Sequence, residues 1–448
     1  MKAHLIAVGG SAMHNLAIAL YKKGIKVTGS DDEINDPAKS NLQRYGLLPD
    51  YVGWNVDKIT PDLDAVILGM HARLDNPELI RAQELGLRIY SYPEYLYEQT
   101  KNKIRIVIAG SHGKTTITAM ILHVLKYRNV NFDYLAGAAL EGFETSLKLS
   151  EDAPIAIFEG DEYLASALDR RPKFLLYKPN IALISGVAWD HINVFPTYRS
   201  YVEQFENFVK ELPSGGSLIY CAEDDEVKKL ALLTVSGVKK FPYHTLINFV
   251  KDGVTYLEDS TRLEVFGKHN LLNMGGARQV CLLLGISEAE FAEAISSFKG
   301  AARRLQLVAR NETTNIYWDF AHSPSKLTAT IQAVKEQFPK RKLVACMELH
   351  TFSSLTKEFL KEYQGTMAKA DVRKVYFNPH VLEHKRLAAL SAEEVKNYFG
   401  NVEVYTDSAK MIDSLKEIKW EKTNLLMMSS GNFDGVNVKG FAEELLRH

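Results

Sequence analysis

The apolar residues of this chain recur in short runs that alternate with longer segments of helical periodicity. Runs such as "IRIVIA" (104–109) and "KLVACME" (342–348) have the length and composition of buried strands. Segments such as "SKLTATIQAVKEQF" (325–338) space their apolar residues three and four apart, as an amphipathic helix does. Because strands that alternate with helices build parallel sheets covered by helices, the chain is predicted to be an α/β protein.

The same pattern divides the chain into three blocks, which we expect to be domains of residues 1–100, 101–300 and 301–448. The first block opens with predicted strands at Leu5–Val8 and Lys26–Gly29, joined by a helix, and is expected to be Rossmann-like. The second opens with the apolar run 104–109 and the glycine-rich turn "GSHGKTT", and is expected to be a parallel-sheet domain of the P-loop ATPase type. The third again alternates strands and helices and is expected to be a Rossmann-like α/β domain.

Composition narrows the class of protein. The chain of 448 residues is 46% hydrophobic and 24% charged, with a formal net charge of -1, so neither nucleic acid nor an anionic membrane is an expected partner. Three cysteines lie far apart in the sequence, which favours a reducing compartment over a disulfide framework. No apolar run approaches the length of a membrane span, and the first run is too short for a signal segment. We therefore expect a cytoplasmic protein.

A glycine-rich turn follows the strand Ile104–Ala109 and precedes a predicted helix, Thr115–Leu125. Such a turn points backbone N–H groups at an anion, and the helix N-terminus adds partial positive charge. Lys114 would reach the outer phosphates of ATP, and the Thr115 hydroxyl would bind Mg²⁺. The spacing is shorter than usual, because two residues rather than four separate the glycines. The predicted ATP-binding loop consists of Gly110, Ser111, His112, Gly113, Lys114, Thr115 and Thr116.

Acidic residues follow the next apolar runs. "IAIFEGDEY" places Glu159, Asp161 and Glu162 at the end of a predicted strand, and "ISGVAWDH" does the same with Asp190 and His191. The carboxyl ends of parallel strands are where ligands bind, and a carboxylate is a natural Mg²⁺ ligand. The three acids taken alone are equally consistent with a solvated turn, and a lone histidine is more often structural or exposed than a ligand. A second metal held by His191 would suit a phosphoryl transfer that produces two anions.

Three further polar groups are candidate nucleotide contacts. Asn270 and Asn273 are three apart, so a helix would place both amides on one face, where they could pair with adenine, although Asn270 could also be a helix cap. Of the adjacent arginines 303–304, one would point inward if the chain is extended and could clamp a phosphate. Asp319 follows a strand and could accept ribose hydroxyls. Each of these residues alone is also consistent with an ordinary surface group.

The first block has its own nucleotide signal. Gly9 and Gly10 follow the first strand, and Asp31 stands about twenty residues later, which is the spacing of a dinucleotide fold. The full G-x-G-x-x-G fingerprint is not present, so NAD is weakly supported and a nucleoside diphosphate fits as well. His71 and Arg73 form a possible second polar edge.

Together the segments "GSHGKTT", "EGDEY", "WDH", "GKHNLLN", "ARRLQ" and "WDFAHSP", in this order and at these separations, resemble the Mur ligase family of ATP-dependent amide ligases. The resemblance covers essentially the whole chain. It implies that the first domain binds a UDP-sugar, the central domain binds ATP and Mg²⁺, and the third binds an amino compound.

The resemblance also implies residue roles. The UDP-substrate residues would be Gly9, Gly10, Ser11, Ser30, Asp31, His71 and Arg73. Beyond the loop, the ATP residues would be Asn270, Asn273, Arg304 and Asp319. The metal ligands would be Thr115, Glu159, Glu162 and His191, and the catalytic residues Lys114, Glu159 and His191. The amino substrate would meet His322 and His350.

Two kinds of family member compete. The segment 161–205 and the ending "SSGNFDGV" are similar to ligases that join UDP-N-acetylmuramate to the murein tripeptide L-alanyl-γ-D-glutamyl-meso-diaminopimelate in cell-wall recycling. "MELHTFSS" instead resembles ligases that add L-alanine, since His350 stands where the tripeptide type has arginine. Both types lack the modified lysine of other members, and Phe205 stands near that place. We expect UDP-N-acetylmuramate and either amine as partners, and a monomer or weak dimer.

The expected chemistry activates a carboxylate as an acyl phosphate, which an amine then attacks. One alternative of another class is a regulator that senses nucleotide sugars without catalysis. A kinase or GTPase is disfavoured because no guanine-reading motif is present.

Overall fold

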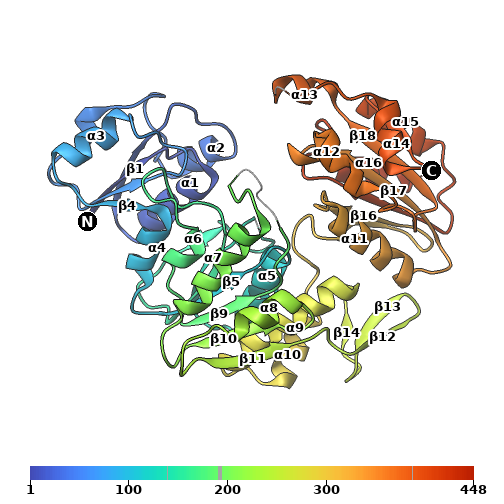
Figure 1. Ribbon diagram of the computed structural model, residues 1–448, viewed down its shortest axis with the longest axis horizontal. Helices are drawn as coiled ribbons and strands as arrows, with labels where there is room; N and C mark the ends of the chain where they lie inside the picture. The colour runs from blue at the N-terminus through green and yellow to red at the C-terminus, as the bar shows by residue number, and fades with distance from the viewer. Residues whose placement is uncertain (139, 190–193, 386, 448) are drawn as a thin grey trace. The chain divides into compact units, whose positions relative to one another are not determined.

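The computed structural model describes residues 1–138, 140–189, 194–385 and 387–447. The chain divides into two compact units, residues 1–244 with 272–295 and residues 245–271 with 296–448 (Figure 1). Helix α9 (Lys268–Leu283) runs across the division. Within the described ranges, no helix has both the length and the apolar character to span a bilayer.

The first unit begins with a four-stranded parallel sheet of order β2-β1-β3-β4. Its strands are β1 (Lys2–Ile6), β2 (Lys26–Ser30), β3 (Ala65–Leu68) and β4 (Ile89–Ser91). Its helices are α1 (Ser11–Lys22), α2 (Ala38–Arg44), η1 (Val56–Lys58), α3 (Pro77–Glu84) and α4 (Tyr92–Thr100). The strand predicted to reach Val8 ends at Ile6 because Ala7 adopts a φ of 67° and the N–H groups of Ala7 and Val8 both turn to the Ser30 carbonyl.

A seven-stranded sheet of order β11-β10-β9-β5-β8-β6-β7 completes the first unit. Its strands are β5 (Ile104–Ala109), β6 (Phe132–Leu135), β7 (Leu147–Lys148), β8 (Ile155–Glu159), β9 (Ile181–Ile184), β10 (Ser217–Cys221) and β11 (Lys239–Tyr243). The accompanying helices are α5 (Lys114–Tyr127), α6 (Lys173–Leu176), α7 (Tyr198–Lys210), α8 (Asp225–Ala231) and α10 (Glu288–Ile295). Among these described strands β6 and β7 pair antiparallel, whereas the other neighbours are parallel.

The order of the strands places a topological switch beside β5. The chain leaves β5 toward β6 on one side, returns to β8, and then crosses to β9 on the other side of β5. Ligands of open α/β sheets bind at the carboxyl ends of the strands at such a point. The loop after β5 therefore lies at the position in this sheet where a ligand is expected.

The second unit holds a six-stranded sheet of order β15-β16-β20-β17-β18-β19 and a three-stranded sheet of order β12-β13-β14. The strands are β12 (Asn248–Lys251), β13 (Val254–Leu257), β14 (Arg262–Leu263), β15 (Gln306–Arg310), β16 (Asn315–Asp319), β17 (Lys342–Leu349), β18 (Val372–Phe377), β19 (Glu403–Tyr405) and β20 (Thr423–Met428). The helices are α11 (Pro324–Gln337), η2 (Ser353–Leu355), α12 (Lys357–Leu360), η3 (Lys361–Tyr363), α13 (Pro379–His384), α14 (Ala392–Phe399), α15 (Ser408–Lys416) and α16 (Val438–Leu445).

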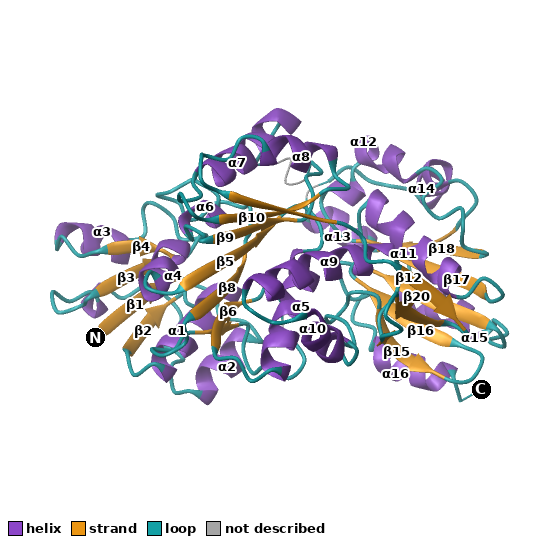
Figure 2. Ribbon diagram, turned by 90° about the horizontal axis from the view of Figure 1, so that it is seen from below, coloured by secondary structure: helices purple, strands orange, loops and turns teal. Residues whose placement is uncertain are grey.

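Strand β17 shows why the strands of this sheet have continuously apolar sequences. Leu343 and Met347 pack in one hydrophobic cluster with residues of α11, whereas Val344 and Cys346 pack in another with residues of α15 and α16. Side chains that alternate along a strand point to opposite faces, so both faces of the sheet are buried beneath helices (Figure 2). The predicted α/β class is confirmed.

Candidate active site

The glycine-rich turn predicted from the sequence joins β5 to α5 at the centre of the seven-stranded sheet. Gly113 has a φ of 80°, and a Cβ placed there would collide with the side chain of Asn273. No side chain of the described residues caps the start of α5, so its first N–H groups are open to another acceptor. The turn has the form of an anion-binding cradle that only glycine can complete at this position.

Lys114, the first residue of α5, is folded back on its own loop. Its Nζ donates to the Gly110 carbonyl oxygen at 2.6 Å and to Glu162 Oε2 at 2.8 Å. Burial opposes the charge on this side chain, but the neighbouring carboxylates, Glu162 first, outweigh that cost and raise the pKa of Lys114. The lysine is therefore a full cation at neutral pH, beside the open N–H groups of the helix.

Thr115 and Glu159 form a second contact beside the loop. The Thr115 hydroxyl donates to Glu159 Oε1 at 2.7 Å, and the Gly137 N–H donates to Glu159 Oε2 at 2.7 Å. Two neighbouring ligands of an octahedral Mg²⁺ with bonds near 2.05 Å stand about 2.9 Å apart. The hydroxyl and the carboxylate oxygen thus have the chemistry and the separation of a pair of Mg²⁺ ligands.

Glu162 belongs to a different set of contacts. Besides Lys114, it accepts a hydrogen bond at 3.1 Å from the hydroxyl of Tyr201 in α7. That hydroxyl lies 2.9 Å from Ser111 Oγ, and Ser111 Oγ accepts the Ala188 N–H at 2.8 Å. Of the two glutamates, Glu159 is the one that touches Thr115. The predicted ligand His191, together with Asp190, lies outside the described residues.

At the first sheet, the structure brings three of the predicted UDP-substrate residues together. The Gly9 N–H donates to Asp31 Oδ2 at 2.7 Å, and the Ser30 carbonyl oxygen accepts the N–H groups of the turn that leads to Gly9. Burial raises the pKa of Asp31, although the Gly9 N–H acts in the opposite direction. Gly10 and Ser11 open α1 next to this contact.

His71 and Arg73 lie in the loop after β3, the strand next to β1. Both are exposed, and Arg73 Nε pairs with Asp75 at 3.1 Å. The structure therefore places them at the carboxyl end of the same sheet, on a separate loop from Gly9 and Asp31.

The two predicted adenine contacts separate along α9. The side-chain amide of Asn270 donates to the Phe266 carbonyl oxygen at 2.9 Å, so this buried residue stabilises the start of its own helix. The side chain of Asn273, one turn later, lies against Gly113 of the loop.

In the second unit, Asp319 ends β16 and is buried. Its carboxylate accepts the Leu305 N–H at 2.6 Å and the Ala321 N–H at 2.5 Å, while burial raises its pKa. The preceding arginines do not form the extended segment that was considered, because Arg303 has a φ of 55° and the chain turns. Arg304 lies over the ring of Phe320, 4.6 Å from its centroid.

The carboxyl ends of β17 and β20 gather a further polar group. Glu348 is buried and accepts the Phe433 N–H at 2.8 Å and a hydrogen bond from the Ser429 hydroxyl. His350 Nδ1 stands 3.6 Å from Glu348 Oε1, and its side chain is 39% exposed. Burial opposes ionisation of Glu348, but His350 and these donors outweigh it and lower its pKa. His350 therefore offers an exposed imidazole backed by a carboxylate.

His322, the other predicted amino-substrate residue, follows β16. Its Nδ1 lies 2.8 Å from the Phe320 carbonyl oxygen, and its own carbonyl oxygen accepts the Tyr363 hydroxyl.

Comparison with known proteins shows the family of this chain. Three family models match the chain: "Mur ligase family, catalytic domain" over residues 2–103, "Mur ligase middle domain" over 108–281, and "Mur ligase, glutamate ligase domain" over 303–431. The UDP-N-acetylmuramate–L-alanine ligase of Clostridium kluyveri is 31% identical over 382 residues, which cover 81% of each chain. The chain belongs to the Mur ligase family. It is an ATP-dependent ligase that forms amide bonds.

Two further relatives span nearly the whole ligase. The UDP-N-acetylmuramate–L-alanyl-γ-D-glutamyl-meso-2,6-diaminoheptandioate ligase of Haemophilus influenzae is 24% identical over 458 residues, 97% of each chain. The crystal structure of the UDP-N-acetylmuramate–alanine ligase MurC of Thermotoga maritima superposes with a TM-score of 0.68 at 22% identity, covering 100% of this chain and 98% of that one. The α/β fold is thus that of a solved Mur ligase.

Two residues that contact the candidate residues could not be singled out from the sequence. Tyr201 stands on the buried stripe of an amphipathic helix, where a tyrosine hydroxyl needs a partner. Glu348 is a glutamate inside an apolar strand, where a charge needs donors. In each case the sequence shows a polar residue at a position that is expected to be buried, but it does not show which residue is its partner.

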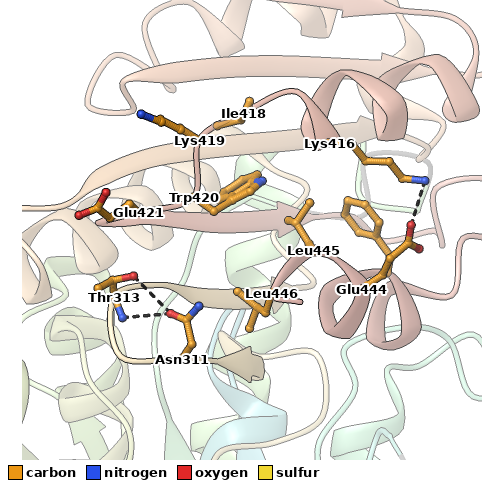
Figure 3. A pocket seen from close by; sticks show the side chains of 11 residues that line it. Asn311, Thr313, Lys416, Ile418, Lys419, Trp420, Glu421, Glu444, Leu445 and Leu446 are labelled. Carbon is orange, nitrogen blue, oxygen red and sulfur yellow. Dashed lines mark hydrogen bonds and ion pairs between the residues drawn. The ribbon is translucent and has the colours of Figure 1, made fainter. Parts of the chain in front are cut away.

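A cavity of about 540 Å³ lies elsewhere in the second unit (Figure 3). It is lined by the turn between β15 and β16, the segment between α15 and β20, and the end of α16. The lining includes Trp420 and the ion pair of Lys416 with Glu444 at 3.2 Å. Because these segments precede β16 and β20, the cavity lies at the amino ends of the strands, away from His350.

Proposed function

We propose that this ligase joins the lactyl carboxylate of UDP-N-acetylmuramate to the amine of L-alanyl-γ-D-glutamyl-meso-diaminopimelate, in peptidoglycan recycling. The observation that supports this choice is the pattern of residues 161–205 with the ending "SSGNFDGV", which resembles ligases of the tripeptide type. The H. influenzae tripeptide ligase is similar to this chain over 97% of both chains.

In the proposed reaction, the γ-phosphoryl group of ATP is transferred to the carboxylate, because an acyl phosphate has a good leaving group and a free carboxylate does not. The N–H groups at the start of α5 and the Lys114 ammonium would stabilise the charge on the transferring group. The Nζ of Lys114 lies 2.6 Å from the Gly110 carbonyl oxygen, within the loop that would hold the phosphates.

Thr115 and Glu159 would hold Mg²⁺, since their oxygens lie 2.7 Å apart at the edge of the loop. The metal would neutralise charge on the phosphate oxygens. His191 is proposed for a second metal from the family resemblance.

The amine of the second substrate then attacks the acyl phosphate and displaces phosphate. We propose that His350 and His322 contact the amino substrate, and that Gly9, Gly10, Ser11, Ser30, Asp31, His71 and Arg73 hold the UDP-sugar. Fixing both reactants at set positions supplies a large part of the rate.

The test is an ADP-release assay with UDP-N-acetylmuramate and either amine. Tripeptide-dependent ADP release that exceeds the alanine-dependent rate is expected. Faster turnover with L-alanine would overturn the assignment in favour of the second candidate, the L-alanine ligase. That candidate is favoured by the 31% identity to the C. kluyveri enzyme. ATP binding without ADP release with any amine would instead indicate a nucleotide-sugar sensor.

A further inference from the structure

Tyr201 connects the phosphate-binding loop to the acidic segment after β8. Its side chain is fully buried, and its hydroxyl lies 3.1 Å from Glu162 Oε1 and 2.9 Å from Ser111 Oγ. Glu162 in turn holds the loop lysine, Lys114, at 2.8 Å. A single hydroxyl thus contacts both the loop itself and the carboxylate that binds the lysine of the loop.

The direction of each hydrogen bond in the series that joins Ala188, Ser111, Tyr201 and Glu162 follows from the chemistry of the groups. A carboxylate can only accept, so the Tyr201 hydroxyl gives its one proton to Glu162. Ser111 must therefore donate to the Tyr201 oxygen, and Ser111 Oγ accepts the Ala188 N–H at 2.8 Å. Every group donates once to the next, from the Ala188 amide to the Glu162 carboxylate.

The aromatic surroundings hold the tyrosine ring in place. Phe195 and Phe205 pack edge-on against it, with centroid distances of 5.5 and 5.3 Å. The start of α7 is fixed by a capping box between Thr197 and Ser200. The hydroxyl consequently has little freedom to leave Glu162.

Binding of a triphosphate changes what Lys114 must do. The ammonium that now contacts Glu162 would turn to the phosphates, and Glu162, which is 1% exposed, would lose a charged donor. A buried carboxylate that loses a donor is costly unless other donors remain. The Tyr201 hydroxyl can remain, because its own position does not depend on Lys114.

We propose that Tyr201 is a positioning residue for ATP: its hydroxyl retains Glu162 while Lys114 exchanges that carboxylate for the phosphates. The inference rests on the proposed role of the loop in binding ATP. It extends that role to a residue outside the loop, on α7.

The test is Tyr201→Phe, which removes the hydroxyl and keeps the ring. The affinity for the non-hydrolysable analogue adenylyl imidodiphosphate, measured by calorimetry in saturating Mg²⁺, is expected to fall about tenfold, which corresponds to about 1.4 kcal/mol. The KM for ATP should rise by a similar factor while kcat changes little. A role in folding alone would lower the active fraction and kcat and leave the KM unchanged.

Tyr134→Phe is the matched control, because it also removes a buried tyrosine hydroxyl of the first unit, one that donates to the Thr145 carbonyl oxygen at 2.9 Å. It should leave the analogue affinity unchanged. A second comparison uses Glu162→Gln, which has no charge to retain. In that background Tyr201→Phe should weaken analogue binding less than twofold.

Two results would overturn the inference: wild-type affinity in Tyr201→Phe, or an equal loss in the Glu162→Gln background. If Tyr201→Phe does not fold, Thr197→Ala removes the side-chain cap that fixes the start of α7, outside the phosphate-binding loop, and is expected to weaken analogue binding more in the wild-type background than in the Glu162→Gln background. Failure of the proposed function would look different, because it would show in the wild-type protein, as faster ADP release with L-alanine than with the tripeptide or as no ADP release with either amine.

Discussion

At the scale of single residues, the structure separates two glutamates that the sequence presents three positions apart. Glu159 accepts from the Thr115 hydroxyl and the Gly137 N–H, at 2.7 Å in both cases. Glu162 accepts from Lys114 and Tyr201. The two carboxylates are chemically alike and differ in their partners. Glu159 contacts a hydroxyl that could bind the same metal ion, whereas Glu162 contacts the ammonium of Lys114.

This difference in partners predicts that substitutions of Glu159 and Glu162 change the Mg²⁺ dependence of ADP release to different extents. Glu159→Gln removes the charge of the proposed Mg²⁺ ligand and should raise the Mg²⁺ concentration for half-maximal ADP release about tenfold or more. Glu162→Gln should leave that concentration within about twofold, although it weakens the hold on Lys114. The measurement is a Mg²⁺ titration at saturating ATP. A larger shift for Glu162→Gln than for Glu159→Gln would show that the ligand has been assigned to the wrong residue.

Lys114 should be required for phosphoryl transfer. Its pKa is raised by the neighbouring carboxylates, so Lys114→Ala deletes a full positive charge from the loop. The expected loss in kcat for ADP release is about 100-fold or more. Lys126→Ala is the control, since this lysine lies on the same helix and its Nζ donates to the Gly142 carbonyl oxygen at 2.6 Å. Near-normal turnover by Lys114→Ala would remove the loop from the mechanism.

At the scale of elements, one arginine organises the connection between the two sheets of the first unit. Arg105, in β5, is buried and donates to the carbonyl oxygens of Thr100 at 3.0 Å, Lys103 at 3.0 Å and Lys178 at 2.9 Å. It thereby ties the end of α4 to the strand that carries the phosphate-binding loop.

Arg105→Ala should therefore destabilise the first unit, because one buried and two part-buried carbonyl groups lose their donor together. A loss of roughly 3 kcal/mol is expected, with a fall of roughly 5 °C or more in the midpoint of thermal unfolding. Arg199→Ala is the control, since that arginine is 64% exposed and pairs on the surface with Glu206 at 2.6 Å. Equal midpoints for the two variants would contradict the role of Arg105.

How much of the structure could be predicted from the sequence also differs from element to element. The strand Ile104–Ala109 and the glycine turn were predictable, because apolar runs and positive-φ glycines act over a few residues. The pairing of Tyr201 with Ser111 was not, since it joins positions 90 residues apart. For Asn270 the sequence left two readings open, an adenine contact and a helix cap, and its amide donates to the Phe266 carbonyl oxygen at the start of its own helix. Local periodicity predicts elements, whereas long-range contacts decide which polar groups are left to bind ligands.

At the scale of the whole molecule, the predicted binding residues are divided between the two compact units. The loop, the acidic segment and the glycine turn of the first sheet lie in residues 1–244. Asp319, His322 and His350 lie in residues 296–448. The predicted amino-substrate residues, His322 and His350, both lie in the second of these ranges. A substitution of one of them should change the KM for the amine and leave the other KM values nearly unchanged.

His350→Ala tests this division. The imidazole is 39% exposed and Nδ1 lies 3.6 Å from Glu348 Oε1, and His350 is the residue proposed to contact the amino substrate. Its loss should raise the KM for the amine about tenfold, or ~1.4 kcal/mol, while the KM for ATP changes less than about twofold. His380→Ala is the matched control, because His380 is 87% exposed and stands 3.5 Å from Glu383 in the same unit. The measurement is steady-state kinetics with each substrate varied in turn. If His350→Ala raised the KM for ATP and left the KM for the amine unchanged, His350 would belong to the nucleotide site.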